Sequence, residues 1–171
     1  MLEDDSGQRE VYERYGIAMY QAQVLEHLIT QTLSVAKTAA KQFRTREEVS
    51  RDYDSNYTKT LGTLIGLLRP YIEDSRLEKE LRAALETRNR LAHHFFWEHD
   101  GHLETFEGQS LMEEDAYDAQ VQFQAAIMKL YPVMGRYLDA IGVAPDEHLE
   151  GLGSAIQEQM RLYPERNSEG G

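Results

Sequence analysis

Apolar residues recur every three or four positions along most of the chain, which is the period of α-helices that pack on a common core. The strict alternation typical of half-buried strands is absent. The longest apolar stripe predicts a first helix over residues 8–43. This stripe comprises Val11, Tyr15, Ala18, Ala22, Leu25, Ile29, Leu33 and Ala36.

Capping signals predict where the second helix begins and ends. Thr45, with Glu48 three residues later, has the spacing of a capping box that opens a helix. We expect this helix to break near residues 54–56 and to resume over residues 60–69. Pro70 should end it, because proline has no N–H to donate and crowds the preceding turn.

The third helix is predicted to begin with Asp74 or Ser75 as its cap and to reach about residue 96. Residues 98–108 contain an Asp-Gly pair, which is typical of a turn, and should form an ordered loop or a small hairpin. This segment should separate the third helix from the fourth.

The fourth predicted helix is long and covers residues 111–141. Ser110 and Glu113 have the capping-box spacing at its start. Pro132 and Gly135 should kink it, because proline interrupts the hydrogen-bond ladder of a helix.

The C-terminal segment predicts a short last helix from residue 145, followed by a polar tail over residues 165–171 that should fray. Residues 1–171 therefore predict a single domain of the all-α class, an up-and-down bundle of four to five helices. The side chains of the last helix that should face inward are Leu149, Leu152, Ile156 and Met160.

Composition narrows the classes of protein. The 171 residues include no cysteine, which excludes disulfides and thiolate metal sites and favours a reducing, cytoplasmic location. The acidic start does not have the pattern of a signal peptide, and the longest apolar run, residues 61–68, is too short to cross a membrane. A net charge of -12 argues against a broad basic surface for nucleic acid. It does not exclude a small phosphate site, for which arginine, at 13 residues against 5 lysines, is well suited.

The third predicted helix carries an arginine within its apolar stripe. Arg88 falls at the centre of the stripe, where a buried guanidinium without a partner would be strongly destabilising. It must therefore meet a carboxylate, open onto a polar cleft or face a second subunit. The apolar residues of the stripe are Leu77, Leu81, Ala84, Leu85, Ala92 and Phe95.

Four polar residues are candidates to act with Arg88. Asn89 and His93 are four positions apart and share one flank of the helix, whereas His94 points to the other side. Glu26 lies at the edge of the first helix's stripe and is a candidate to pair with Arg88 across the bundle. The alternative is that Glu26 is solvated.

The segment RNRLAHH, residues 88–94, resembles the signature of the HEPN superfamily. That signature is an arginine, usually followed by a polar residue, and then a histidine after about four to six further residues. Arg88, Asn89 and His93 match these three positions, and His94 matches at the next longer spacing. The helical bundle with the motif near the end of its third helix also fits this superfamily.

The resemblance implies a metal-independent endoribonuclease, often a toxin of a toxin–antitoxin or phage-defence system, with RNA as substrate. It also implies a homodimer whose two motifs form one cleft, and an antitoxin or regulatory protein as a further partner. No cofactor and no metal ion are expected. Members that a partner nucleotidyltransferase neutralises carry a tyrosine two residues after the histidine. Phe95, or Phe96 when counted from His94, occupies that position here, which argues against this form of control.

These residue types suit RNA cleavage without a metal. The reaction needs a base at the 2′-hydroxyl, an acid at the leaving 5′-oxygen and positive charge near the phosphorane. His93 would transfer protons, Arg88 would bind the phosphate, and Asn89 would orient His93 or bind a phosphate oxygen. Because one chain offers a single clear histidine, acid and base would come from the two copies of a homodimer.

Two other hypotheses stay open. One is a catalytically silent HEPN-like domain that binds a nucleotide, RNA or a protein partner, and the other is a structural dimerisation module in which Arg88 forms an internal ion pair. The acidity of the chain favours these two, whereas the intact Arg-Asn-His set favours the nuclease.

Other candidate groups receive simpler interpretations. The acidic and histidine side chains that follow the motif have no known metal-binding spacing and are assigned to a polar loop; they are His94, Glu98, His99 and His102. Five helical tyrosines are assigned to the core or to a seam between subunits; they are Tyr12, Tyr15, Tyr20, Tyr131 and Tyr137.

Overall fold

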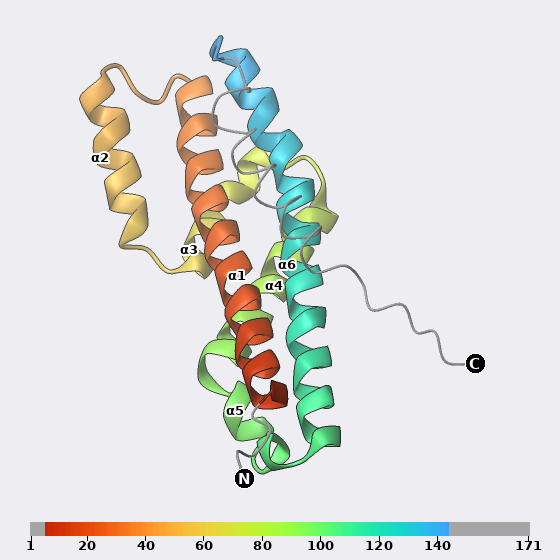
Figure 1. The fold of residues 1–171 in the computed structure, drawn as a ribbon. Helices are drawn as coiled ribbons and strands as arrows, with labels where there is room; N and C mark the ends of the chain where they lie inside the picture. Colours follow the sequence, from red (N-terminus) through yellow and green to blue (C-terminus); the bar gives the residue numbers. More distant parts are fainter. Residues whose placement is uncertain (1–5, 144–171) are drawn as a thin grey trace.

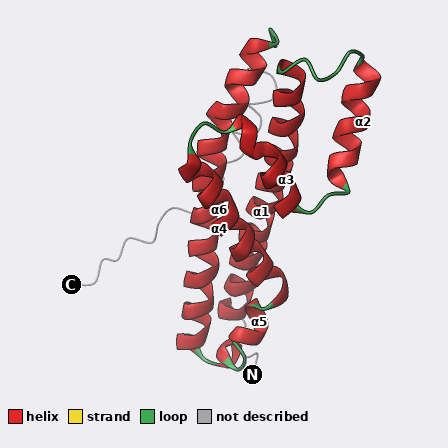
Figure 2. Ribbon diagram, turned by 180° about the vertical axis from the view of Figure 1, so that it is seen from behind, coloured by secondary structure: helices red, strands yellow, loops and turns green. Residues whose placement is uncertain are grey.

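The computed structural model describes residues 6–143, which form helices and connecting turns without a β-strand (Figure 1, Figure 2). The predicted all-α class is confirmed. Three long helices form the body of the molecule: α1 at Ser6–Ala39, α4 at Ser75–His93 and α6 at Phe106–Ala140. α1 is thus shifted slightly toward the N-terminus relative to the predicted range.

The core lies between these three helices. α1 and α6 run side by side in the same direction and share the most extensive packing, while α4 packs against them in the opposite direction (Figure 1). Each large apolar side chain buried there stabilises the fold by about 1.5–3 kcal/mol. The largest fully buried ones include Leu25, Leu28, Ile29, Leu33, Leu81, Leu91, Phe123 and Ile127.

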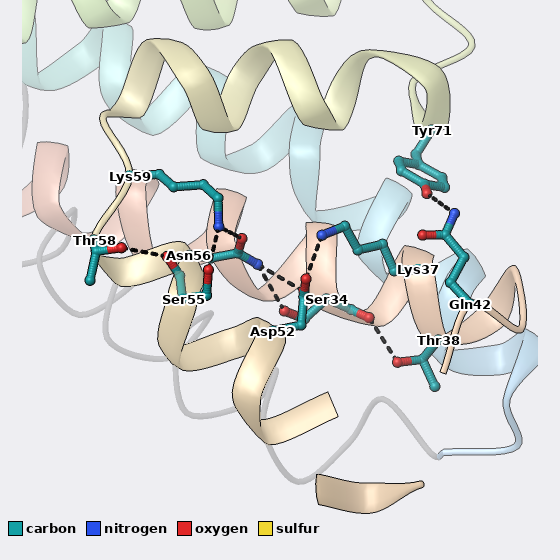
Figure 3. A network of polar contacts seen from close by, with 10 residues as sticks. All are labelled: Ser34, Lys37, Thr38, Gln42, Asp52, Ser55, Asn56, Thr58, Lys59 and Tyr71. Atoms are coloured by element: carbon teal, nitrogen blue, oxygen red, sulfur yellow. Dashed lines mark hydrogen bonds and ion pairs between the residues drawn. The ribbon is translucent and has the colours of Figure 1, made fainter. Parts of the chain in front are cut away.

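The helix α2, Arg46–Tyr57, lies on the outer side of α1, away from α6 (Figure 1, Figure 2). Asn56 is its one buried residue. Lys37 of α1 contacts Asp52 at 2.6 Å, and the Asn56 amide donates to the same carboxylate at 3.0 Å (Figure 3). Polar contacts therefore carry much of the attachment of α2 to the body.

The Thr45 capping box is confirmed, with the Thr45 hydroxyl accepting from the Glu48 N–H and the Glu48 side chain bonded back to the cap. The predicted break is present, but it lies at residues 58–60 rather than at residues 54–56. α2 continues to Tyr57, because Asn56 has partners for its amide group inside the helical conformation.

The second part of the predicted helix is a separate element. α3 spans Leu61–Leu68, begins at the cap Thr60, and passes into a 3₁₀ turn, Arg69–Tyr71, that contains Pro70. α3 runs in the same direction as α1. Leu61, at its start, lines a groove together with residues from the middle of α1. Tyr71, just after its end, accepts a hydrogen bond from Gln42, which follows the end of α1. α1, α2, α3, α4 and α6 thus alternate in direction, as an up-and-down bundle does.

The end of the third predicted helix differs from the expectation. Asp74 caps α4 as predicted, but α4 ends at His93 because His94 leaves the helical conformation at φ −127° and ψ −20°. A further short helix, α5, follows at Phe95–Glu98. Residues 6–143 therefore contain six α-helices rather than four or five.

The segment before α6 is an ordered connection without a hairpin, and it includes a 3₁₀ turn at His102–Glu104. α6 begins after its cap Thr105, so Ser110 lies inside the helix, contrary to the prediction. The helix continues through Pro132. The predicted last helix and the predicted frayed tail lie outside the described residues.

Candidate functional site

Arg88 lies on the line of α4 that faces the core, between Ala84 and Leu91, as the stripe predicted. Two members of the predicted stripe are placed differently, since Leu85 is half-buried and Ala92 is exposed. Leu91 is 1% exposed and takes the inward position instead. The core face of α4 thus turns slightly from the predicted one, and the Arg88 side chain keeps 34% of its surface exposed.

The carboxylate that Arg88 meets is Glu26 of α1. Arg88 Nε lies 2.7 Å from Glu26 Oε1, and the two side chains are 34% and 29% exposed. The predicted pairing is confirmed. Arg88 Nη1 also donates to Asn89 Oδ1 at 3.1 Å. An ion pair with this much exposure contributes only about 0–1 kcal/mol to stability, so holding the guanidinium in place is its clearer effect.

The two histidines of the motif lie at the exposed end of α4. His93 is its last residue and His94 follows it, and their rings form a T-shaped pair with centroids 6.4 Å apart. Neither imidazole forms a hydrogen bond among the described residues. The structure therefore brings together Arg88, Asn89 and Glu26, and leaves His93 free to meet a ligand about one turn further along.

A tyrosine of α1 fixes this end of α4. The Tyr15 hydroxyl donates to the Leu91 carbonyl at 3.2 Å, and its ring packs on Phe95 and Phe96 at centroid distances of 5.1 and 5.0 Å. Tyr131 and Tyr137 pack against the core as predicted. Tyr12 and Tyr20 are 52% and 46% exposed, so they are not core residues of the single chain.

A second polar cluster, which the sequence analysis missed, lies on the other side of α4. The guanidinium of Arg90 donates both terminal amino groups to Asp115 of α6, at 2.8 and 2.6 Å, and Nη1 also donates to Glu98 at 3.0 Å. His99 Nε2 lies 2.9 Å from the same Asp115 carboxylate, and His99 Nδ1 lies 3.0 Å from Nδ1 of His102. Glu98 and the two histidines, which the sequence assigned to a polar loop, are therefore joined to α4 and α6 in one hydrogen-bonded network.

The contact between Arg90 and Asp115 shifts the pKa values of both groups. The hydrogen bond from Arg90, assisted by one from His99, holds the pKa of Asp115 below its ordinary value although burial opposes this. The same bond to Asp115 raises the pKa of the Arg90 guanidinium. The sequence contains no motif that links these residues, because Asp115 comes from α6 and meets Arg90 only through helix packing.

The described residues were also searched for metal-binding clusters and membrane-spanning helices. Among the described residues, no three or more side chains of the His, Asp and Glu types are placed to hold a metal ion. Within residues 6–143, no helix has the length and apolarity needed to cross a membrane.

Comparison of the chain with protein-family models, curated proteins and solved structures gave no match. The HEPN resemblance therefore stays a prediction that rests on the motif and on the helical architecture.

Proposed function

We propose that the protein is an endoribonuclease of HEPN type, a toxin or phage-defence module that acts as a homodimer. The observation that carries the proposal is the arrangement on α4. Arg88 is oriented by Glu26 and Asn89, and His93 stands unpaired at the exposed end of the same helix. This is the combination of a phosphate-binding fork and a proton-transfer group that RNA cleavage requires.

In the proposed reaction, Arg88 binds the scissile phosphate and stabilises the charge of the phosphorane. His93 of one copy takes the proton of the 2′-hydroxyl, and His93 of the other copy protonates the leaving 5′-oxygen. The 2′-oxygen attacks phosphorus as the bond to the 5′-oxygen breaks, which leaves a 2′,3′-cyclic phosphate and a free 5′-hydroxyl.

Exposed aromatic residues support dimerisation at this end of the molecule. Trp97 and Phe106 are 80% and 79% exposed, and Phe96 and Tyr12 are 38% and 52% exposed and pack on each other with centroids 5.9 Å apart. Exposed aromatic groups are enriched at protein interfaces. A second copy bound here would lie next to the end of α4 that carries His93.

The test is incubation of the pure protein with a mixed RNA pool in EDTA, followed by mass spectrometry of the ends. We expect cleavage with cyclic-phosphate ends and a loss of roughly 10²-fold or more in His93→Ala, the usual value of a positioned proton-transfer group. His94→Ala is the matched control, because it removes a neighbouring exposed imidazole, and it should change cleavage much less. Cleavage that needs a metal, or equal activity of wild type and His93→Ala, would overturn the mechanism.

One observation favours a second function. The contact of Arg88 with Glu26 is the internal ion pair expected of a structural dimerisation module. In that case Arg88→Ala would unfold the protein as severely as truncation of a core leucine does, about 2–5 kcal/mol. A folded Arg88→Ala variant that has lost cleavage would instead support the nuclease.

A further inference from the structure

A groove lies next to the candidate site and shares Glu26 with it. It opens between α1 and the connection from α2 to α3, has a volume of about 250 Å³, and has Leu61 and Leu64 as its apolar wall. Pockets for drug-sized ligands measure roughly 300–1,000 Å³. The size of this groove therefore suits one small ligand, such as a single nucleotide, better than a dinucleotide cofactor.

The groove carries an uncompensated positive charge. Lys59 Nζ donates to Ser55 Oγ at 2.7 Å and to Asn56 Oδ1 at 2.9 Å, and both acceptors are neutral (Figure 3). No carboxylate of the described residues lies within ion-pair distance of Lys59, whereas Glu26, the carboxylate that lines the groove, is paired with Arg88. In a chain with a net charge of -12, this ammonium group is a local site for an anion.

Tyr57 and His27 also line the groove, and hydrogen bonds join Tyr57 to His27 and to Tyr53. The Tyr57 hydroxyl lies 2.7 Å from His27 Nδ1 and 2.7 Å from the hydroxyl of Tyr53. If Tyr57 donates to Nδ1, a neutral His27 carries its proton on Nε2, where it is a donor for a ligand. The Tyr57 side chain is 54% exposed and offers its ring to a planar base.

We infer that this groove binds a nucleoside monophosphate unit, with the phosphate at Lys59 and the base against Tyr57 and His27. The inference rests on the proposed function for one point only, namely whether the bound nucleotide is part of an RNA substrate. If RNA is the substrate, the bound unit is a nucleotide close to the phosphate that Arg88 holds, because Glu26 borders both sites. A free mononucleotide is the other source of the same chemistry.

The first experiment is calorimetric titration of the full chain with adenosine 5′-monophosphate, uridine 5′-monophosphate and inorganic phosphate. Lys59→Gln keeps an amide for Ser55 and Asn56 but loses the charge, and we expect it to weaken mononucleotide binding by about tenfold or more. Lys79→Gln removes an exposed lysine of α4 and should leave binding unchanged. Tyr57→Ala should weaken binding of the mononucleotides and spare that of phosphate.

The second experiment measures RNA cleavage by the same variants, after circular dichroism has shown that they are folded. Raised KM in Lys59→Gln with little change in kcat assigns the groove to the RNA substrate. Mononucleotide binding that needs Lys59, without any RNA cleavage, would reject the nuclease proposal and keep the groove as a site for free nucleotides. Absence of mononucleotide binding at millimolar concentration, or unchanged affinity in Lys59→Gln, would overturn the inference whether or not RNA is cleaved.

Discussion

Arg88 and Arg90 lie two residues apart on α4, and the bundle holds them in different ways. Arg88 faces α1 and meets the carboxylate of Glu26 through Nε, whereas Arg90 faces α6 and grips Asp115 with both terminal amino groups. His99 adds a second bond to Asp115 on the Arg90 side. The two-pronged contact uses the fork of Arg90 fully, while the contact through Nε leaves more of the Arg88 fork for another anion.

The two contacts lead us to expect different roles for the two arginines. A bidentate arginine bond between two helices fixes their distance and register, so we assign Arg90 to the joint between α4 and α6. Both arginine side chains are 34% exposed, but Arg88 contacts its carboxylate through Nε alone and can therefore share that partner with a phosphate.

The largest effect concerns cleavage. If RNA cleavage is confirmed, Arg88→Ala should lower it by roughly 10²-fold or more, because it removes the charge that stabilises the phosphorane. Arg90→Ala should keep cleavage within about tenfold, since Arg90 is occupied by Asp115. Rates on one RNA under single-turnover conditions decide the comparison, with circular dichroism as the control for folding. Equal losses in the two variants would contradict the assignment of different roles.

The second effect concerns stability, which should depend more on the contact of Arg90 than on that of Arg88. Asp115→Ala leaves Arg90 and His99 without their shared acceptor and should lower the free energy of unfolding by about 1–3 kcal/mol. Glu26→Ala removes a single ion-pair contact, whereas Asp115 accepts from both Arg90 and His99, and it should cost less than ~1 kcal/mol. Urea unfolding of both variants is the measurement. Leu91→Ala, a truncation at a position that is 1% exposed, provides a reference of about 2–5 kcal/mol for a core defect.

The third effect is the pH dependence of that stability. The pKa of Asp115 is lowered in the folded protein by its bond from Arg90, so its contribution is complete above the ordinary value of 3.8. The contribution is lost as pH falls through the lowered folded pKa. The difference in free energy of unfolding between wild type and Asp115→Asn should thus stay constant above about pH 5 and shrink below about pH 4.

A control is needed, because other titratable groups face Asp115. Glu98 shares Arg90 with it and His99 bonds to it directly. Glu98→Gln should retain most of the acid dependence, since its contact with Arg90 is single and its side chain is 46% exposed. A difference between wild type and Asp115→Asn that does not change between pH 5 and the acid limit of folding would contradict the predicted link.

The sequence predicted what repeats along the helices and missed what depends on packing between distant segments. The stripe of α1, the Thr45 box and the Asp74 cap are local patterns, and all three appear in the structure. The partner of Arg88 could be named as a candidate, because Arg88 is a charged residue within the apolar stripe of its helix and Glu26 lies at the edge of the first helix's stripe. The structure confirms this pair. A charge within an apolar stripe is itself a signal for a complementary charge.

The Arg90 cluster gave no such signal. Its members come from α4, α5, α6 and the connection between α5 and α6, and they meet only after α4 ends at His93 and the chain turns through α5. The sequence analysis extended α4 to residue 96 and placed Phe95 and Phe96 on a continuous helix, so it did not predict this turn. The Tyr15 ring packs on both phenylalanine rings at tilted angles and supports the turn from α1, a tertiary contact that local helix propensity does not predict.

The energy that couples each arginine to its carboxylate compares the two contacts directly, and it is the smallest of the expected effects. In a double-mutant cycle, the coupling between Glu26 and Arg88 should be about 0.2–1 kcal/mol, the range of exposed ion pairs. The coupling between Asp115 and Arg90 should be larger, above ~1 kcal/mol, because two charge-assisted bonds are lost together. Each cycle needs the two single alanine variants and the double variant, unfolded in urea at neutral pH and at two salt concentrations. Salt should weaken both couplings, because the two pairs are similarly exposed, with side-chain exposures of 34% and 29% for Arg88 and Glu26 and of 34% and 26% for Arg90 and Asp115. A Glu26 coupling as large as that of Asp115 would make Arg88 a structural residue like Arg90, and the dimerisation-module hypothesis would then replace the nuclease.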